Sequence, residues 1–221
     1  MNFAIRKAGC WPWLLLSLWP VLASALPGFQ EVKSAWRPSE AYLLDRDGKP
    51  LQELRLDFKT RRLPWVALEQ ISPTLIAAIL TAEDRRFQAH HGVDWSSIAA
   101  ATLGRLVGRP ARGASTLTMQ LAALLDPRLA PGKTGRNWAQ KWTQIRAALE
   151  LEETWSKREI LEAYLNLVGF RGEFQGIAAA ARAFFGKQPS GLSEAEALVL
   201  DRKSTRLNSS HYGRSRMPSS A

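Results

Sequence analysis

The sequence predicts a mainly α-helical protein with a short β element before its helices and an apolar segment at its N-terminus. Apolar residues recur at helical spacing over most of residues 72–200. Capping residues, prolines and glycines interrupt this pattern at intervals typical of globular helices. Hydrophobic residues make up 46% of the 221-residue chain, which is enough to build a folded core.

The N-terminal 26 residues contain an apolar run from residue 11 to residue 26, which follows Arg6 and Lys7. This run is shorter than the ~20 residues of a typical membrane-spanning helix, and it contains two prolines. It is either a signal anchor with its positive end in the cytoplasm or a cleaved signal peptide with an Ala-Ser-Ala site at residues 23–25. We favour the anchor, and both interpretations place the rest of the chain outside the cytoplasm.

Residues 27–60 are expected to form a linker and a β element. Pro27, Gly28 and Pro38 indicate a linker that extends to residue 40. Residues 41–58 then read as two short strands on either side of a turn at Asp47 and Gly48. This element precedes the helical domain, which we place at residues 61–200.

Seven helices are expected in that domain. Polar caps mark several helix starts, namely Ser72 before Pro73, Asp94, and Ser115 or Thr116. Two more helices begin with a serine followed three residues later by a glutamate, at residues 156–159 and 193–196. The fourth helix carries an apolar stripe at helical spacing, made of Trp138, Trp142, Ile145 and Leu149.

Residues 201–221 break this pattern, because they contain six serines and five Lys or Arg residues and almost nothing apolar. They are either a disordered basic tail or foreign sequence joined to a truncated reading frame, and we favour the second interpretation. In either case they are not expected to contribute to the fold. The last helix would then be cut short near residue 200 and would expose Leu198 and Leu200.

Composition restricts the partners. The net charge of +10 suits polyanions such as nucleic acid, anionic lipid headgroups or phosphorylated substrates. The N-terminal segment argues against nucleic acid, because both of its interpretations direct the chain out of the cytoplasm. Cys10 is the single cysteine, so no intramolecular disulfide can form, and no Cys/His cluster has the spacing of a zinc site.

Glu83 is the first candidate catalytic residue. Helical spacing places it on the same face as three apolar residues, Ile76, Leu80 and Phe87. A carboxylate on such a face is partly removed from water, as a general acid or base requires. The alternative is a carboxylate at the rim of the core that pairs with Arg85 or Arg86.

A second candidate site lies at residues 113–120, where a glycine leads into a helix start that carries Ser115 and Thr116. Free backbone N–H groups and hydroxyls at a helix N-terminus suit a phosphate, although plain N-capping would explain the same residues. Lys141 and Gln144 flank the apolar stripe of the fourth helix, and spacing alone places them on a solvated polar face.

Taken in order, these segments resemble the five motifs of the family 51 peptidoglycan glycosyltransferases. The corresponding ranges are residues 83–94, 113–121, 141–166, 176–187 and 192–197. Within that family, the sequence of residues 113–127 is most similar to the 1C branch of the penicillin-binding proteins. Five motifs in the same order are a specific signal, and they cover most of the predicted helical domain.

The resemblance implies a lysozyme-like, mostly α-helical domain on the periplasmic side of the inner membrane, anchored by a single pass. Its substrates would be lipid II and the growing glycan strand, and cell-wall synthesis proteins would be its partners. Glu83 would act as the catalytic base that deprotonates the acceptor sugar. The positions that match substrate contacts in the family are Arg86, Ser115, Thr116, Gln120, Lys141 and Gln144. No metal site can be read from the sequence, and a divalent cation at the diphosphate stays an open alternative.

Two departures bear on this resemblance. Many relatives carry a glutamate where this chain has Gln144, and a lysine or arginine where it has Ala123. We interpret the glutamine as a trait of the 1C branch and expect Gln144→Glu to be tolerated or mildly activating. Two alternatives stay open, namely a lysozyme-like or lytic transglycosylase enzyme that cleaves glycan, and an inactive truncated fragment.

Overall fold

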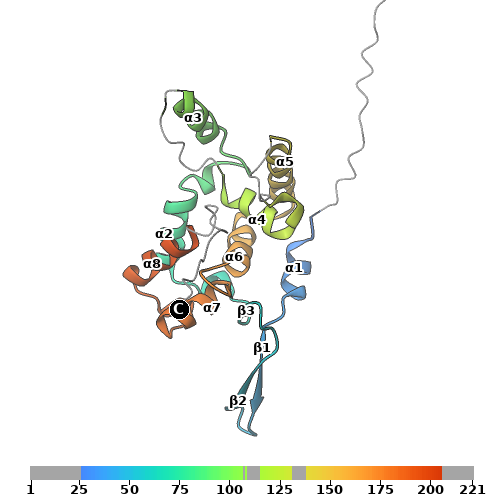
Figure 1. The fold of residues 1–221 in the computed structure, drawn as a ribbon, viewed down its shortest axis with the longest axis vertical. Helices are drawn as coiled ribbons and strands as arrows, with labels where there is room; N and C mark the ends of the chain where they lie inside the picture. The colour runs from blue at the N-terminus through green and yellow to red at the C-terminus, as the bar shows by residue number, and fades with distance from the viewer. Residues whose placement is uncertain (1–25, 107, 109–114, 131–137, 206–221) are drawn as a thin grey trace, which may run out of the picture.

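The computed structural model describes residues 26–106, 108, 115–130 and 138–205 (Figure 1). This part of the chain contains eight α-helices and four short strands, so the prediction of a mainly α-helical protein is confirmed. Within these ranges no helix is long and apolar enough to cross a membrane. The apolar segment that we interpret as an anchor lies almost entirely in residues 1–25, outside the described residues.

The segment predicted as a linker contains a helix, α1 (Phe29–Ala35). Phe29 packs edge-to-face against Trp155, with ring centroids 5.3 Å apart, and Lys33 Nζ lies 2.9 Å from Glu162 Oε1. These contacts join α1 to residues more than 120 positions away in the sequence, and they stabilise a helix that its local sequence does not predict. The linker prediction is therefore wrong for residues 29–35.

The β element forms as predicted. Strands β1 (Glu40–Leu44) and β2 (Pro50–Arg55) are antiparallel, and the turn between them places Gly48 at a φ of 78°. The hairpin extends away from the helical body (Figure 1). A second small sheet, absent from the sequence predictions, pairs β3 (Arg61–Arg62) in parallel with β4 (Phe174–Gln175).

All seven predicted helices are present in the body. They are α2 (Pro73–Glu83), α3 (Trp95–Leu106), α4 (Leu117–Leu125), α5 (Trp138–Thr154), α6 (Lys157–Leu167), α7 (Ile177–Phe185) and α8 (Glu194–Thr205). The predicted capping box at residues 156–159 forms, with Ser156 and Glu159 each accepting a backbone N–H of the other. The same reciprocal pair forms at residues 193–196 before α8.

Helix α6 lies in the main core, with contacts to α4, α1 and α7. Its Ile160, Ala163 and Leu165 side chains are fully buried. Gly176 precedes α7 at a φ of +84°, and a Cβ there would lie 2.6 Å from the Asn166 carbonyl oxygen at the end of α6. Only glycine therefore permits this close approach between the two helices.

Helix α8 corrects one expectation. It continues to Thr205, beyond the boundary expected near residue 200. Leu200, predicted to be exposed, has 0% exposure and belongs to the main core, because α8 packs against α2. Leu198 is 50% exposed, as predicted. Residues 206–221, which make up most of the tail predicted to be disordered or foreign, lie outside the described residues.

Candidate active site

Glu83 is the last residue of α2, and its side chain is half-buried. Its Oε2 atom accepts a hydrogen bond of 3.0 Å from Gln120 Nε2. Its Oε1 atom is shielded from solvent and has no hydrogen-bond partner among the described residues. A buried carboxylate oxygen without a donor is costly, and such atoms are typical of functional sites.

Neither neighbouring arginine neutralises Glu83. Arg85 Nε donates to the Thr81 carbonyl oxygen, and Arg86 Nη1 contacts Ser96 and lies 3.5 Å from Asp94 Oδ1. The alternative interpretation, in which Glu83 is the rim partner of one of these arginines, is therefore wrong for this structure.

Gln120 connects Glu83 to a third helix. Its Oε1 atom accepts a hydrogen bond of 3.2 Å from the hydroxyl of Tyr164, a buried residue on α6. The carboxylate of α2, the amide of α4 and the phenol of α6 thus form one chain of hydrogen bonds. Tyr164 was given no role from the sequence, although it lies inside the third motif-like range.

The N-terminus of α4 uses its candidate hydroxyls in two different ways. Thr116 is buried and caps the helix, since its Oγ1 accepts from Met119 N at 3.2 Å and donates to the Gly92 carbonyl oxygen at 2.5 Å. Ser115 is half-buried, and its Oγ accepts a hydrogen bond of 2.9 Å from Lys141 Nζ. The structure therefore brings a cation and a hydroxyl together at this helix start.

Asp84 and His90 link the end of α2 to the start of α4. The His90 Nε2 atom lies 3.0 Å from both Asp84 carboxylate oxygens, and Asp84 Oδ2 also accepts from Leu117 N, in the first turn of α4, at 3.0 Å. The His90 carbonyl oxygen accepts from Lys157 Nζ at 2.6 Å. The residue beside the candidate base therefore ties α2 to α4, a function that spacing along one helix could not predict.

Glycine is required at position 92 by a close approach to α5. Gly92 has a φ of +74°, and a Cβ there would lie 2.5 Å from the Ala148 carbonyl oxygen. Because Thr116 donates to the carbonyl oxygen of this same glycine, the loop of residues 84–94 is held between α4 and α5.

Gln144 does not lie on a solvated face, contrary to the prediction from spacing. It is 0% exposed, and its Nε2 donates to the Met119 carbonyl oxygen on α4 at 2.7 Å. Trp142, predicted to lie in the buried stripe, is instead 53% exposed. Helix α5 therefore packs on α4 through the side that carries Gln144, Ile145 and Ala148, because α4 supplies a carbonyl oxygen to pair with the buried amide.

Arg86 lies in the segment between α2 and α3, and its side chain reaches the start of α3. Its partner Asp94 also accepts hydrogen bonds from Ser96 Oγ at 2.6 Å and from Ser97 Oγ at 2.7 Å. Burial raises the pKa of Asp94, but these hydrogen bonds and the Arg86 charge outweigh burial and hold the pKa well below its usual range. The Arg86 side chain remains 54% exposed, so its guanidinium is accessible from solvent.

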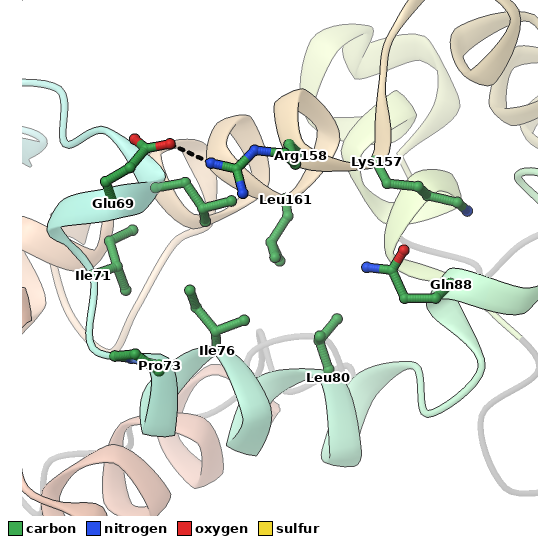
Figure 2. A pocket seen from close by; sticks show the side chains of 10 residues that line it. Glu69, Ile71, Pro73, Ile76, Leu80, Gln88, Lys157, Arg158 and Leu161 are labelled. Atoms are coloured by element: carbon green, nitrogen blue, oxygen red, sulfur yellow. Dashed lines mark hydrogen bonds and ion pairs between the residues drawn. The ribbon is translucent and has the colours of Figure 1, made fainter.

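A pocket of about 310 Å³ lies between α2 and α6. Figure 2 shows Ile76 and Leu80 pointing into it from α2 toward Leu161 on α6, with the ion pair of Glu69 and Arg158 at one side. These are the α2 residues that helical spacing placed on the face of Glu83, yet Glu83 does not line the pocket. In the part of the chain that the structure describes, no group of three or more His, Cys, Asp or Glu residues could hold a metal ion.

Comparison with known proteins identifies the family. The family model described as "Transglycosylase" matches residues 47–216. The chain belongs to the transglycosylase family. The matched range of this transglycosylase extends beyond residue 200, where composition placed the end of the domain.

Curated relatives agree with this membership. The transglycosylase chain is 42% identical over 157 residues to the biosynthetic peptidoglycan transglycosylase of Rhodospirillum centenum, a match that covers 69% of this chain and 65% of that protein. It is 40% identical over 210 residues to penicillin-binding protein 1C of Escherichia coli, covering 89% of this chain and 25% of that protein. Penicillin-binding protein 2D of Bacillus subtilis is 37% identical over 173 residues, covering 78% and 24%. The chain thus spans just under two thirds of the first relative and about a quarter of the other two.

Proposed function

We propose that this transglycosylase is a peptidoglycan glycosyltransferase that polymerises lipid II into glycan strands, with Glu83 as its general base. The observation that carries the proposal is the set of hydrogen-bond partners around the Glu83 carboxylate. One of its oxygens accepts from a neutral amide, and among the described residues the other has no donor and no cation forms an ion pair with either. A carboxylate so placed keeps its capacity to accept a proton.

In the proposed reaction, Glu83 takes the proton of the acceptor sugar's 4-hydroxyl while that oxygen attacks the anomeric carbon of the growing chain. The bond from that carbon to the diphosphate oxygen breaks, and the lipid diphosphate leaves with the electron pair. Attack from the side opposite the leaving group inverts the configuration at the anomeric carbon. Glu83 then returns its proton to solvent, which completes the balance of the reaction.

The diphosphate is proposed to bind near the N-terminus of α4. Lys141 Nζ and Ser115 Oγ, 2.9 Å apart, together offer a charge and a hydroxyl for an anion, and the exposed guanidinium of Arg86 offers a second charge. Thr116 and Gln144 are buried and engaged with the backbone, so we assign them support of the loop and of α4 instead of direct contact. Gln120 is assigned to hold the Glu83 carboxylate through its side-chain amide.

We further propose that residues 11–26 anchor the chain in the inner membrane, with the helical domain on the periplasmic side and a lysozyme-like arrangement of its helices. Lipid II presents its diphosphate at that surface, so an anchor would keep the domain next to its substrate. Other cell-wall synthesis proteins are the expected partners. The relatives named as penicillin-binding proteins and biosynthetic peptidoglycan transglycosylases support this context.

The test is Glu83→Gln in the full chain, assayed with labelled lipid II and separation of the glycan products by length. General-base catalysis supplies about 10²–10⁴-fold in rate, so we expect a loss in that range. Glu153→Gln, at an exposed position of α5, is the matched control and should polymerise normally. Polymerisation by Glu83→Gln within about threefold of wild type would overturn the assignment. Supplying polymerised glycan in place of lipid II tests the glycan-cleaving alternative, which predicts shorter products.

A further inference from the structure

We propose that Tyr164 is a positioning residue for Glu83, acting through the side-chain amide of Gln120. The inference rests on the proposed function of Glu83 and adds a residue to its site. The Tyr164 hydroxyl donates to Gln120 Oε1 at 3.2 Å, and Gln120 Nε2 donates to Glu83 Oε2 at 3.0 Å. The three residues come from α6, α4 and α2, so the chain of bonds also fixes three helices relative to one another.

The direction of these hydrogen bonds follows from the chemistry of the groups. An ionised carboxylate only accepts hydrogen bonds, so the atom of Gln120 that faces Glu83 has to be the NH₂ group. The amide oxygen of Gln120 consequently faces Tyr164, and the phenol hydroxyl donates to it. If the amide were reversed, its oxygen would face the carboxylate oxygen, and the two acceptors would repel each other.

Burial makes Tyr164 a fixed point in this chain. The residue is 2% exposed and belongs to the main core, whereas Gln120 is half-buried and its side chain has several rotatable bonds. A donor held by the core selects one orientation of the amide, and the amide then holds one oxygen of Glu83. The site is thus pre-organised by a residue that does not itself bond the carboxylate.

The consequence is a difference between the two oxygens of Glu83. Oε2 is held by the amide, while Oε1 is shielded from solvent and has no donor in the described structure. The acceptor sugar's hydroxyl would supply the missing donor, and its proton would pass to Oε1. Tyr164 acts on the reaction by keeping the carboxylate turned so that Oε1 is the oxygen left without a donor.

The experiment compares Tyr164→Phe with Tyr42→Phe in the full chain. Both changes remove one phenol hydroxyl and leave the ring, but the Tyr42 hydroxyl bonds Glu40 and Arg182 beside the hairpin. With lipid II as substrate, Tyr164→Phe should lower kcat about tenfold, as expected for loss of a buried hydrogen bond, and leave KM within about twofold. Tyr42→Phe should leave both parameters unchanged. In a Gln120→Ala background, Tyr164→Phe should have no further effect, because the link is already broken.

A second variant and a second measurement guard against a general loss of structure. Ionised, the new glutamate of Gln120→Glu can still accept from Tyr164 but cannot donate to Glu83, and sharing a proton with Glu83 would occupy the base, so the variant should lose at least as much kcat as Tyr164→Phe. In a chain labelled with ¹⁵N-glutamine, the side-chain amide protons of Gln120 should exchange with water markedly faster in Tyr164→Phe than in wild type or Tyr42→Phe. This readout requires no turnover.

The outcomes separate this inference from the proposed function. Turnover and Gln120 exchange in Tyr164→Phe equal to those in Tyr42→Phe would overturn the role of Tyr164, while Glu83→Gln could still abolish polymerisation. Full polymerisation by Glu83→Gln would reject the proposed function itself. Gln120 exchange that is unchanged by Tyr164→Phe would reject the positioning link even in a chain without turnover.

Discussion

Replacing Gln144 with glutamate should destabilise the protein, which reverses the expectation drawn from the sequence. The amide is fully buried, and its Nε2 donates to the Met119 carbonyl oxygen at 2.7 Å. An ionised carboxylate has no proton to donate, so two acceptors would face each other without water. The new side chain could restore the hydrogen bond only by staying protonated at neutral pH.

The magnitude follows from these two routes. An unmade buried hydrogen bond costs about 1–3 kcal/mol. Keeping a glutamate protonated at pH 7.5, about 3 units above its ordinary pKa of about 4.3, costs roughly 4 kcal/mol at 1.36 kcal/mol per unit. A buried ionised carboxylate costs more than an unmade neutral hydrogen bond, so the protonated form is the cheaper route, and Gln144→Glu should lower the free energy of unfolding by about 4 kcal/mol at pH 7.5. Gln144→Met fills a similar volume without charge and should cost less.

Chemical denaturation at two pH values checks this reasoning. Burial raises the pKa of the new carboxyl in the folded state, so the folded state holds its proton more tightly than the unfolded state does. The destabilisation should therefore be largest at pH 7.5 and should shrink toward pH 4.5. A variant as stable as wild type at pH 7.5, or one whose deficit grows as the pH falls, would refute the argument that this position requires a neutral donor.

Two further changes test other parts of the structure. Gly92→Ala should lower the free energy of unfolding by at least about 1–3 kcal/mol, because the residue has a φ of +74° and a Cβ would lie 2.5 Å from the Ala148 carbonyl oxygen. Thermal unfolding measures the loss, and Gly108→Ala is the control, since Gly108 has a similar φ but open space around it. The difference between the two variants gives the cost of the steric contact alone. For Glu162, burial raises the pKa, but hydrogen bonds from Trp65, Lys33 and a backbone N–H outweigh burial and lower it. The stabilisation that the ionised Glu162 carboxylate gives the folded state is complete above its unfolded pKa of about 4.3 and is lost as the pH falls through its lower folded pKa. The difference in free energy of unfolding between wild type and Glu162→Gln should therefore narrow below about pH 4. A gap that does not change with pH would assign the effect to packing alone.

Local signals were sufficient for most helix boundaries, because each depends on residues close in sequence. The capping boxes at Ser156 and Ser193 are examples. Helix α1 was missed because Phe29 is held by Trp155, far along the chain. The buried face of α5 was predicted correctly at Ile145 and Leu149 but not at Trp142 and Gln144, since the partner that lets Gln144 be buried is a carbonyl oxygen of another helix.

In the candidate site too, features set by residues close in sequence were predicted, and features set by distant contacts were not. Helical periodicity pointed to Glu83 because α2 also carries Ile76 and Leu80, whereas Phe87, the third residue of the predicted face, lies beyond the end of α2. Its contact with Gln120 spans 37 positions, and the contact of Gln120 with Tyr164 spans 44. No pattern within one helix contains such distances, so the resemblance to a family supplied Gln120, and Tyr164 required the structure.

Helix α2 ends at the candidate base, and it also receives α8, whose Leu200 enters the core. An 11-residue helix is a stiff element about 16 Å long, and α8 packs against this same helix. The packing of α8 therefore helps to fix the orientation of the helix that carries the candidate base. A substitution that disturbs the packing of Leu200 would consequently disturb the helix that positions the carboxylate.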